Sequence, residues 1–168
     1  MGGCHVNYVR CISDDPMKTM KGIQCTFKLN DDKIGEPEDY LGATLEKMIL
    51  SDGSQCWSMS SKKYVKAAVQ NVEETLEKFE KRFSGHFVAP LRSGYQPEAD
   101  DSAELKADGL QYYQELIGVL RWIVELGRVD ILLEKLLTPE HRALPHIGHL
   151  EQVIHMFGYL NLHPKRNI

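Results

Sequence analysis

The chain has 168 residues, of which 42% are hydrophobic and 26% charged, and its formal net charge is -4. This composition indicates a globular rather than a disordered protein, and the acidic balance shows no overall sign of a phosphate-binding basic surface. The four cysteines are irregularly spaced without a CxxC pair, which predicts reduced thiols in an intracellular protein. No run approaches the roughly 18 apolar residues of a membrane span, so no membrane partner is expected.

The first part of the chain predicts a strand, a helix and a loop. Residues 5–13 are rich in β-branched and aromatic side chains, which is typical of a strand. The Asp-Asp-Pro sequence at residues 14–16 supplies an N-cap and a first-turn proline, so we expect a helix over residues 16–27. Residues 30–39 are polar and contain a glycine and a proline, which indicates a loop.

A hairpin followed directly by a long helix is the clearest predicted unit. Residues 40–50 and 55–59 resemble strands, and the Asp-Gly pair within residues 51–54 is a strong turn signal. A serine at position 60 or 61 is expected to cap a helix over residues 60–83. Apolar residues recur in this helix at spacings of three and four and predict one buried stripe of Tyr64, Val65, Ala68, Val69, Val72, Leu76, Phe79 and Phe83.

The second half of the chain predicts helices separated by breaks. Residues 84–101 are irregular and form the best internal boundary. An amphipathic segment over residues 105–137 is expected to be interrupted at Gly127, and a last helix is expected over residues 146–162. One strand and one hairpin cannot close a sheet with two protected edges, which indicates a piece of a larger protein. The two tryptophans, Trp57 and Trp122, lie on apolar patterns and are expected in the core.

Several short blocks stand in a characteristic order. They read YLG at 40–42, CWSMS at 56–60 with KYV at 63–65, PL at 90–91 with SGY at 93–95, YQELIGVL at 113–120 with GR and DI at 127–131, GHL at 148–150 and YL at 159–160. Together they resemble the reverse transcriptase region of copia-type LTR retrotransposon polyproteins. The resemblance implies an α+β fold, with a residual palm and primer-grip hairpin over residues 1–60 and a helical thumb/connection region over residues 61–168. Its primer-grip-like residues are Tyr40, Leu41, Gly42 and Trp57.

The resemblance also bears on catalysis. It aligns the Tyr-Val-Asp-Asp of this family with residues 5–8, so that Asn7 and Tyr8 stand where the family has its aspartates. The intact family polymerises DNA with Mg²⁺, which requires carboxylate oxygens. An asparagine offers only a neutral carbonyl, and a phenol with a pKa of about 10 is not an anion at pH 7. A third family carboxylate is expected upstream of this chain. The resemblance therefore implies a degraded, non-catalytic fragment that binds no cofactor.

Other clusters have competing interpretations. In the family, the helix after the primer grip lies near the template–primer minor groove, so Lys62, Lys63 and Lys66 are candidate nucleic-acid contacts, although solvation of a helix surface is favoured. Four histidines and a glutamate could suggest zinc: His141, His146, His149, His155 and Glu151. No cysteine lies nearby and no HExxH motif is present, so capping and surface roles are favoured over a metal site. We interpret Arg121, Arg128 and Asp130 as structural.

Three hypotheses follow for the function. The first is a non-catalytic retroelement relic, the second a residual module that binds nucleic acid weakly, and the third a recruited helical module for protein–protein contacts. We rank them in that order, and the oligomeric state stays open. A salt-dependent shift of a labelled primer–template would favour the second hypothesis, and a defined oligomer or co-purifying partner would favour the third.

Overall fold

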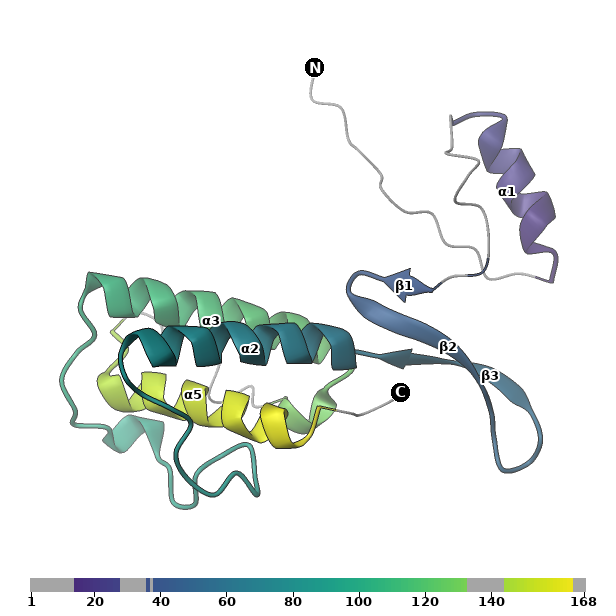
Figure 1. The fold of residues 1–168 in the computed structure, drawn as a ribbon. Helices are drawn as coiled ribbons and strands as arrows, with labels where there is room; N and C mark the ends of the chain where they lie inside the picture. Colours follow the sequence, from purple (N-terminus) through teal and green to yellow (C-terminus); the bar gives the residue numbers. More distant parts are fainter. Residues whose placement is uncertain (1–13, 28–35, 37, 133–143, 165–168) are drawn as a thin grey trace. The chain divides into compact units, whose positions relative to one another are not determined.

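The structure, a computed structural model, describes residues 14–27, 36, 38–132 and 144–164. The chain forms two compact units, Met1–Glu38 and Asp39–Ile168 (Figure 1). This division precedes the hairpin, whereas the boundary predicted at residue 60 follows it. The strand predicted over residues 5–13 lies outside the described residues.

The described part of the first unit contains helix α1, Pro16–Gln24. The Asp15 carboxylate accepts a hydrogen bond from the Lys18 backbone N–H at 3.0 Å, and Pro16 occupies the first turn. Both features are the predicted start signals, and they confirm how the helix begins. The helix ends three residues before the predicted residue 27.

The second unit opens with a three-stranded antiparallel sheet in the order β1-β2-β3, formed by Asp39–Tyr40, Ala43–Ile49 and Gln55–Ser60. Strands β2 and β3 pair from Thr44 opposite Ser60 to Ile49 opposite Gln55. In the connecting turn, the Asp52 carboxylate accepts hydrogen bonds from the Ser54 backbone N–H at 2.9 Å and the Ser54 hydroxyl at 2.6 Å. The predicted hairpin and its Asp-Gly turn are therefore confirmed.

The first strand of that hairpin differs from the prediction at its start. We expected one strand from residue 40 to 50, but the chain reverses at Leu41 and Gly42, which have φ angles of 51° and 94°. Two successive positive φ angles are the geometry of a tight two-residue hairpin turn. This turn pairs Tyr40 with Ala43 and produces the short additional strand β1. Leucine gives no sequence signal for a positive φ angle, so the turn was missed.

Three α-helices pack against one another in the second unit: α2, Lys62–Lys78; α3, Ala107–Glu125; and α5, Ile147–Leu162 (Figure 1). Short 3₁₀ turns, η2 at Pro97–Ala99 and η3 at Val129–Ile131, connect them. The core is formed by Ile131 of η3 and by apolar side chains of the three helices: Val65, Val69, Val72, Leu76, Tyr113, Leu116, Ile117, Leu120, Ile123, Val153, Met156, Phe157, Tyr159 and Leu160. Helices and an antiparallel sheet are thus both present, which confirms the α+β class.

Helix α2 ends earlier than the predicted residue 83. After Lys78 the chain closes the helix with hydrogen bonds from Glu80 N–H to the Glu77 carbonyl and from Lys81 N–H to the Leu76 carbonyl, both at 2.9 Å. Glu80 has a φ angle of 55°, the left-handed conformation that such a helix end requires. Phe79, predicted in the buried stripe, is 71% exposed as a result.

Helix α3 ends by the same hydrogen-bonding pattern, here with a glycine. Gly127 has a φ angle of 100° and donates its N–H to the Val124 carbonyl at 2.8 Å, while Arg128 N–H donates to the Ile123 carbonyl at 3.2 Å. The predicted interruption at Gly127 is confirmed, because glycine adopts this conformation without steric cost. The continuation predicted to residue 137 lies partly outside the described residues.

Polar side chains of α5 hold the irregular segment of residues 84–101. His149, Gln152 and His155 are each buried, and their side-chain nitrogens lie 3.1 Å from the carbonyl oxygens of Pro97, Pro90 and Ala89, respectively. Burial lowers the pKa of His155 from 6.5, so the neutral ring donates its Nε2–H to the Ala89 carbonyl. The segment predicted as an internal boundary is therefore fixed to the last helix.

Candidate nucleic-acid interface

The turn of the predicted Tyr-Leu-Gly block rests on the helices. The Trp122 indole N–H, from α3, donates a hydrogen bond to the Leu41 carbonyl at 3.2 Å. A side-chain carbon at Gly42 would lie 3.2 Å from the Tyr64 ring of α2, and the φ angle of Gly42 also favours glycine. Of the primer-grip-like residues, Leu41 and Gly42 thus fix the start of the sheet against both helices, whereas Tyr40 lies exposed in β1.

The fourth primer-grip-like residue, Trp57, lies on the exposed face of the hairpin. Side chains alternate along β3, and the buried position is taken by Ser58, which is 4% exposed. Trp57 therefore points to the opposite face and is 47% exposed, so the core prediction was wrong for it. The same prediction fails for Trp122, which is 37% exposed and anchors the turn instead.

A lysine accompanies the exposed indole. Lys47 pairs with Trp57 across the two strands, and its ammonium nitrogen lies 5.2 Å from the centre of the Trp57 ring. This distance is typical of a cation–π contact. An exposed aromatic face beside a cation can stack on a nucleobase and attract a phosphate. Lys47 was not among the predicted contact residues, and its position opposite Trp57 is set by the observed pairing of β2 with β3.

Helix α2 begins directly after β3, so the three candidate lysines follow the hairpin without a linker. Lys63 and Lys66 are exposed, and Lys62 is half-buried. The Lys63 ammonium lies 3.6 Å from the Asp39 carboxylate in an exposed ion pair, which offsets part of its charge. Of these three lysines, Lys63 has a carboxylate partner that offsets its charge, so Lys62 and Lys66 are the better candidates for binding a phosphate.

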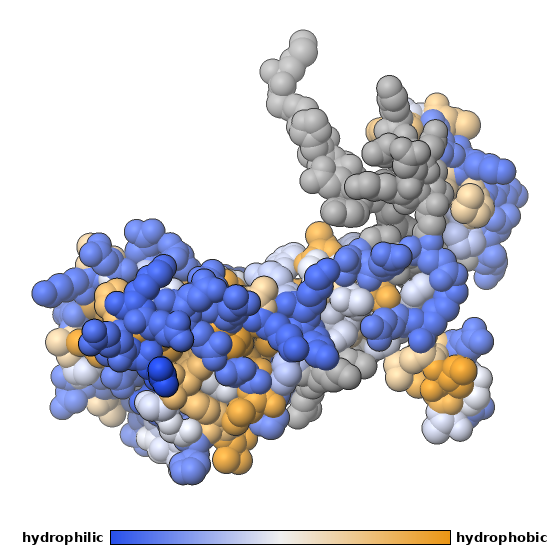
Figure 2. All heavy atoms as spheres, in the orientation of Figure 1, coloured by the Kyte–Doolittle hydropathy of each residue, from blue (hydrophilic) through white to orange (hydrophobic). Residues whose placement is uncertain are grey.

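Apolar side chains gather at the free end of the hairpin. Met48, Ile49 and Leu50 are 39%, 69% and 45% exposed, and Figure 2 shows the hydrophobic atoms at the tip. The candidate interface thus combines an apolar tip, the Lys47–Trp57 pair and the start of α2. The two degenerate catalytic positions, Asn7 and Tyr8, lie outside the described residues, so the structure does not place them beside this surface.

Two of the histidines considered for zinc, His149 and His155, bind other groups of the protein. The His149 ring accepts the His146 backbone N–H at 2.8 Å through Nδ1, which leaves Nε2–H to donate to the Pro97 carbonyl. His155 is held by the Ala89 carbonyl, and His141 lies outside the described residues. Within the described ranges, no group of three histidine, cysteine or carboxylate side chains is arranged to hold a metal ion. In the same ranges, no helix is both long and apolar enough to cross a bilayer.

Arg128 and Asp130, interpreted as structural, form a buried pair. Arg128 is fully buried, and its guanidinium donates to both carboxylate oxygens of Asp130 at 2.8 Å and to the His163 carbonyl at 2.8 Å. The Tyr159 hydroxyl donates to the same carboxylate at 3.2 Å. The hydrogen bonds to His163 and Tyr159 join the segment after α3 to the end of α5, and the Arg128–Asp130 pair stabilises this junction. Arg128 and Asp130 are therefore held by each other and by groups at the end of α5.

A scan of protein-family models and searches of curated proteins and of solved structures found no match to this chain. The functional interpretation of the surface therefore rests on its own residues and geometry.

Proposed function

We propose that the chain is a polymerase-inactive remnant of a copia-type reverse transcriptase, comprising a primer-grip-like hairpin and a thumb-like helical region. The observation that carries the proposal is the continuity of β3 and α2. Strand β3 ends at Ser60 and helix α2 begins at Lys62, so hairpin and helix form one continuous unit. This order matches the second grip strand and the first thumb helix that the sequence blocks resemble.

The proposal includes loss of catalysis, because Asn7 and Tyr8 replace the carboxylates that bind the divalent cations. The test is incorporation of labelled nucleotide onto a primed template with Mg²⁺ or Mn²⁺, with an active reverse transcriptase as the positive control. We expect no incorporation above the buffer blank. Template-dependent incorporation that follows the protein through purification would overturn this part of the proposal.

Weak binding of nucleic acid is the second candidate function. The exposed Trp57 ring, the neighbouring Lys47 and the exposed Lys66 favour it, because they offer stacking and phosphate contacts on adjoining elements. The overall charge of -4 opposes strong electrostatic binding. We therefore expect affinity for a primer–template in the non-specific range, with a Kd of about 10⁻⁴ to 10⁻⁵ M at physiological salt.

A further inference from the structure

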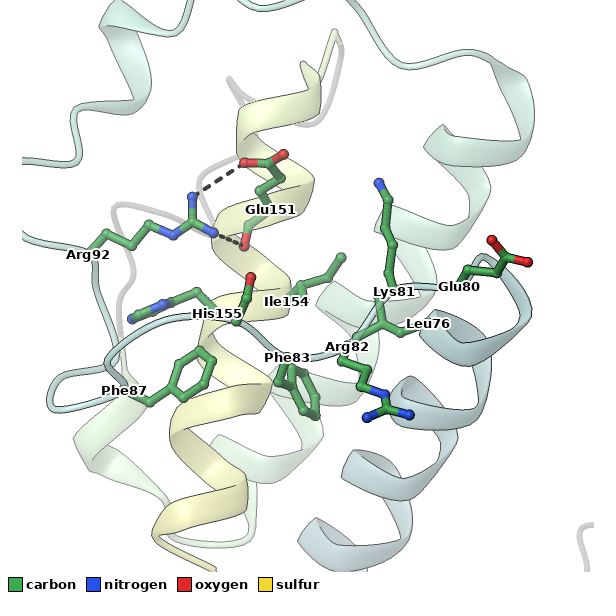
Figure 3. A pocket seen from close by; sticks show the side chains of 11 residues that line it. Leu76, Glu80, Lys81, Arg82, Phe83, Phe87, Arg92, Glu151, Ile154 and His155 are labelled. Atoms are coloured by element: carbon green, nitrogen blue, oxygen red, sulfur yellow. Dashed lines mark hydrogen bonds and ion pairs between the residues drawn. The ribbon is translucent and has the colours of Figure 1, made fainter.

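A cavity lies beside the C-terminal end of α2, about sixteen residues along the chain from the lysines at its start. It has a volume of about 600 Å³ and is bounded by the end of α2, the segment that follows it and one face of α5 (Figure 3). This volume lies within the usual range for small-molecule sites, roughly 300–1,000 Å³. None of the sequence motifs pointed to it, because its lining comes from residues far apart in the chain.

The floor of the cavity is apolar and held in place. Leu76 and Ile154 contribute aliphatic carbons, and Phe83 meets Phe87 edge-to-face with ring centres 6.1 Å apart. The Phe87 ring lies against Gly158 of α5 so closely that any side-chain carbon at Gly158 would overlap it. A close-packed aromatic pair of this kind keeps its shape when a ligand approaches, and it suits a flat apolar body.

Two cations that line the cavity, Lys81 and Arg82, have no ion pair among the described residues. The Arg92 guanidinium is already occupied, with its nitrogens 3.3 Å from the Glu151 carboxylate and 3.5 Å from the Glu151 carbonyl. Lys81 has no ion pair among the described residues, and Figure 3 shows it extending toward the side of the cavity where Glu151 lies. The adjacent Arg82 points in the opposite direction in the same view.

We infer that this cavity binds a small aromatic carboxylate, with its ring on the Phe83–Phe87 floor and its carboxylate on the Lys81 ammonium. The Lys81 ammonium matches one negative charge, and the aromatic floor matches a planar ring. The inference is independent of the proposed nucleic-acid surface, which lies at the other end of α2.

The test is a titration of the full chain with 2-naphthoate, followed by backbone amide NMR. A ligand of this size binding to an open site should have a Kd of about 1 mM. We expect the amide shifts to be confined to residues 80–87 and 151–155. Shifts spread over the hairpin, or no saturable shift up to the solubility of the probe, would overturn the inference.

Two neighbouring residues supply a matched pair of variants. Lys81→Met should weaken naphthoate binding by about three- to fivefold, as expected for one exposed ion pair. Arg82→Met should weaken it less, because the Arg82 side chain points in the opposite direction (Figure 3). The neutral analogue 2-naphthylmethanol should bind the wild-type chain about as weakly as naphthoate binds the Lys81→Met variant. Equal losses in both variants would show a general charge effect and would contradict the assignment of Lys81. The amide spectrum of each variant reports whether the fold is retained.

Discussion

The guanidinium of Arg128 and the carboxylate of Asp130 form a two-pronged ion pair in which both N–O distances are 2.8 Å. Arg128 is completely buried and the Asp130 side chain is 11% exposed, so little solvent screens the pair. Burial alone would raise the pKa of Asp130, but the hydrogen bonds and charge of Arg128 outweigh burial and hold this pKa below 3.8. The pair joins the end of α3 to α5 through the Tyr159 hydroxyl and the His163 carbonyl.

Replacing Asp130 with asparagine should destabilise the protein by about 3 kcal/mol at pH 7, because the Arg128 charge stays buried without its counterion. The folded-state pKa of Asp130 is lower than its unfolded value of 3.8. Its stabilising contribution is therefore fully present above pH 3.8 and is lost as the pH falls through the folded-state pKa.

Urea unfolding of wild type and Asp130→Asn from pH 7 down to about pH 3 measures both effects. The difference between the two proteins should narrow below pH 3.8. As a control, Glu151→Gln breaks an ion pair whose side chains are about half exposed and should cost less than about 0.5 kcal/mol. A difference that stays constant with pH would show that the charge of Asp130 contributes little.

The ends of α2 and α3 have the same backbone geometry, with a positive φ angle at Glu80 and at Gly127. We therefore expect that introducing glycine at the first position raises stability and that removing it from the second lowers stability. Glu80→Gly should stabilise the protein by about 0.5–1 kcal/mol, because glycine adopts the positive φ angle at the end of α2 without strain. Gly127→Ala should destabilise it by about 1 kcal/mol, because alanine is strained at the end of α3. Thermal unfolding of the two variants measures both changes. A lower melting temperature for Glu80→Gly would mean that its side chain makes a contact worth more than the backbone strain.

The close approach of Phe87 to α5 predicts that Gly158 tolerates no side chain. Gly158→Ala should cost about 2 kcal/mol or more, since the ring must move out of a packed site. The matched substitution is Gly118→Ala, at an exposed position of α3 with nothing near the new methyl group, which should stabilise by about 0.5–1 kcal/mol. Chemical denaturation of both variants is the measurement, and equal effects at the two positions would refute the packing argument.

The hydrogen bonds between α5 and residues 84–101 predict that breaking them loosens this segment locally. Gln152→Leu removes the donor to the Pro90 carbonyl and the acceptor for the Arg92 N–H, which lies 3.4 Å away. The stability loss should be about 1–3 kcal/mol, and proteases should cut within residues 84–101 faster than in wild type. Gln114→Leu, at an exposed position of α3, should change neither quantity. Unchanged cleavage in Gln152→Leu would show that the helix does not restrain the segment.

Local signals in the sequence predicted much of this fold. The start of α1 follows from Asp15 and Pro16, the hairpin from its Asp-Gly turn, and the end of α3 from Gly127. Each of these residues acts through its own backbone preference or a hydrogen bond to a neighbour, so no knowledge of tertiary contacts is needed.

The missed features depend on contacts between distant residues. Glu80 and Leu41 adopt positive φ angles that their residue types do not favour, so no local rule indicates them. Trp57 was assigned to the core because it is apolar, but the buried face of β3 carries Ser58 and the opposite, exposed face carries Trp57. The hydrogen bond from Trp122 to Leu41 spans 81 positions and has no signal in either segment.

The most direct test of the proposed primer-grip surface is the salt dependence of primer–template binding, measured by fluorescence anisotropy between about 50 and 200 mM salt. Replacing Lys62, Lys63 and Lys66 with glutamine should weaken binding and reduce the slope of log affinity against log salt by about 2, since Lys63 is partly compensated by Asp39. The control makes the same charge change at the other end of α2 and beyond, in Lys78, Lys81 and Arg82, and should leave the slope unchanged. Absence of binding at the lowest salt, or equal changes in both triple variants, would contradict the assignment of this surface.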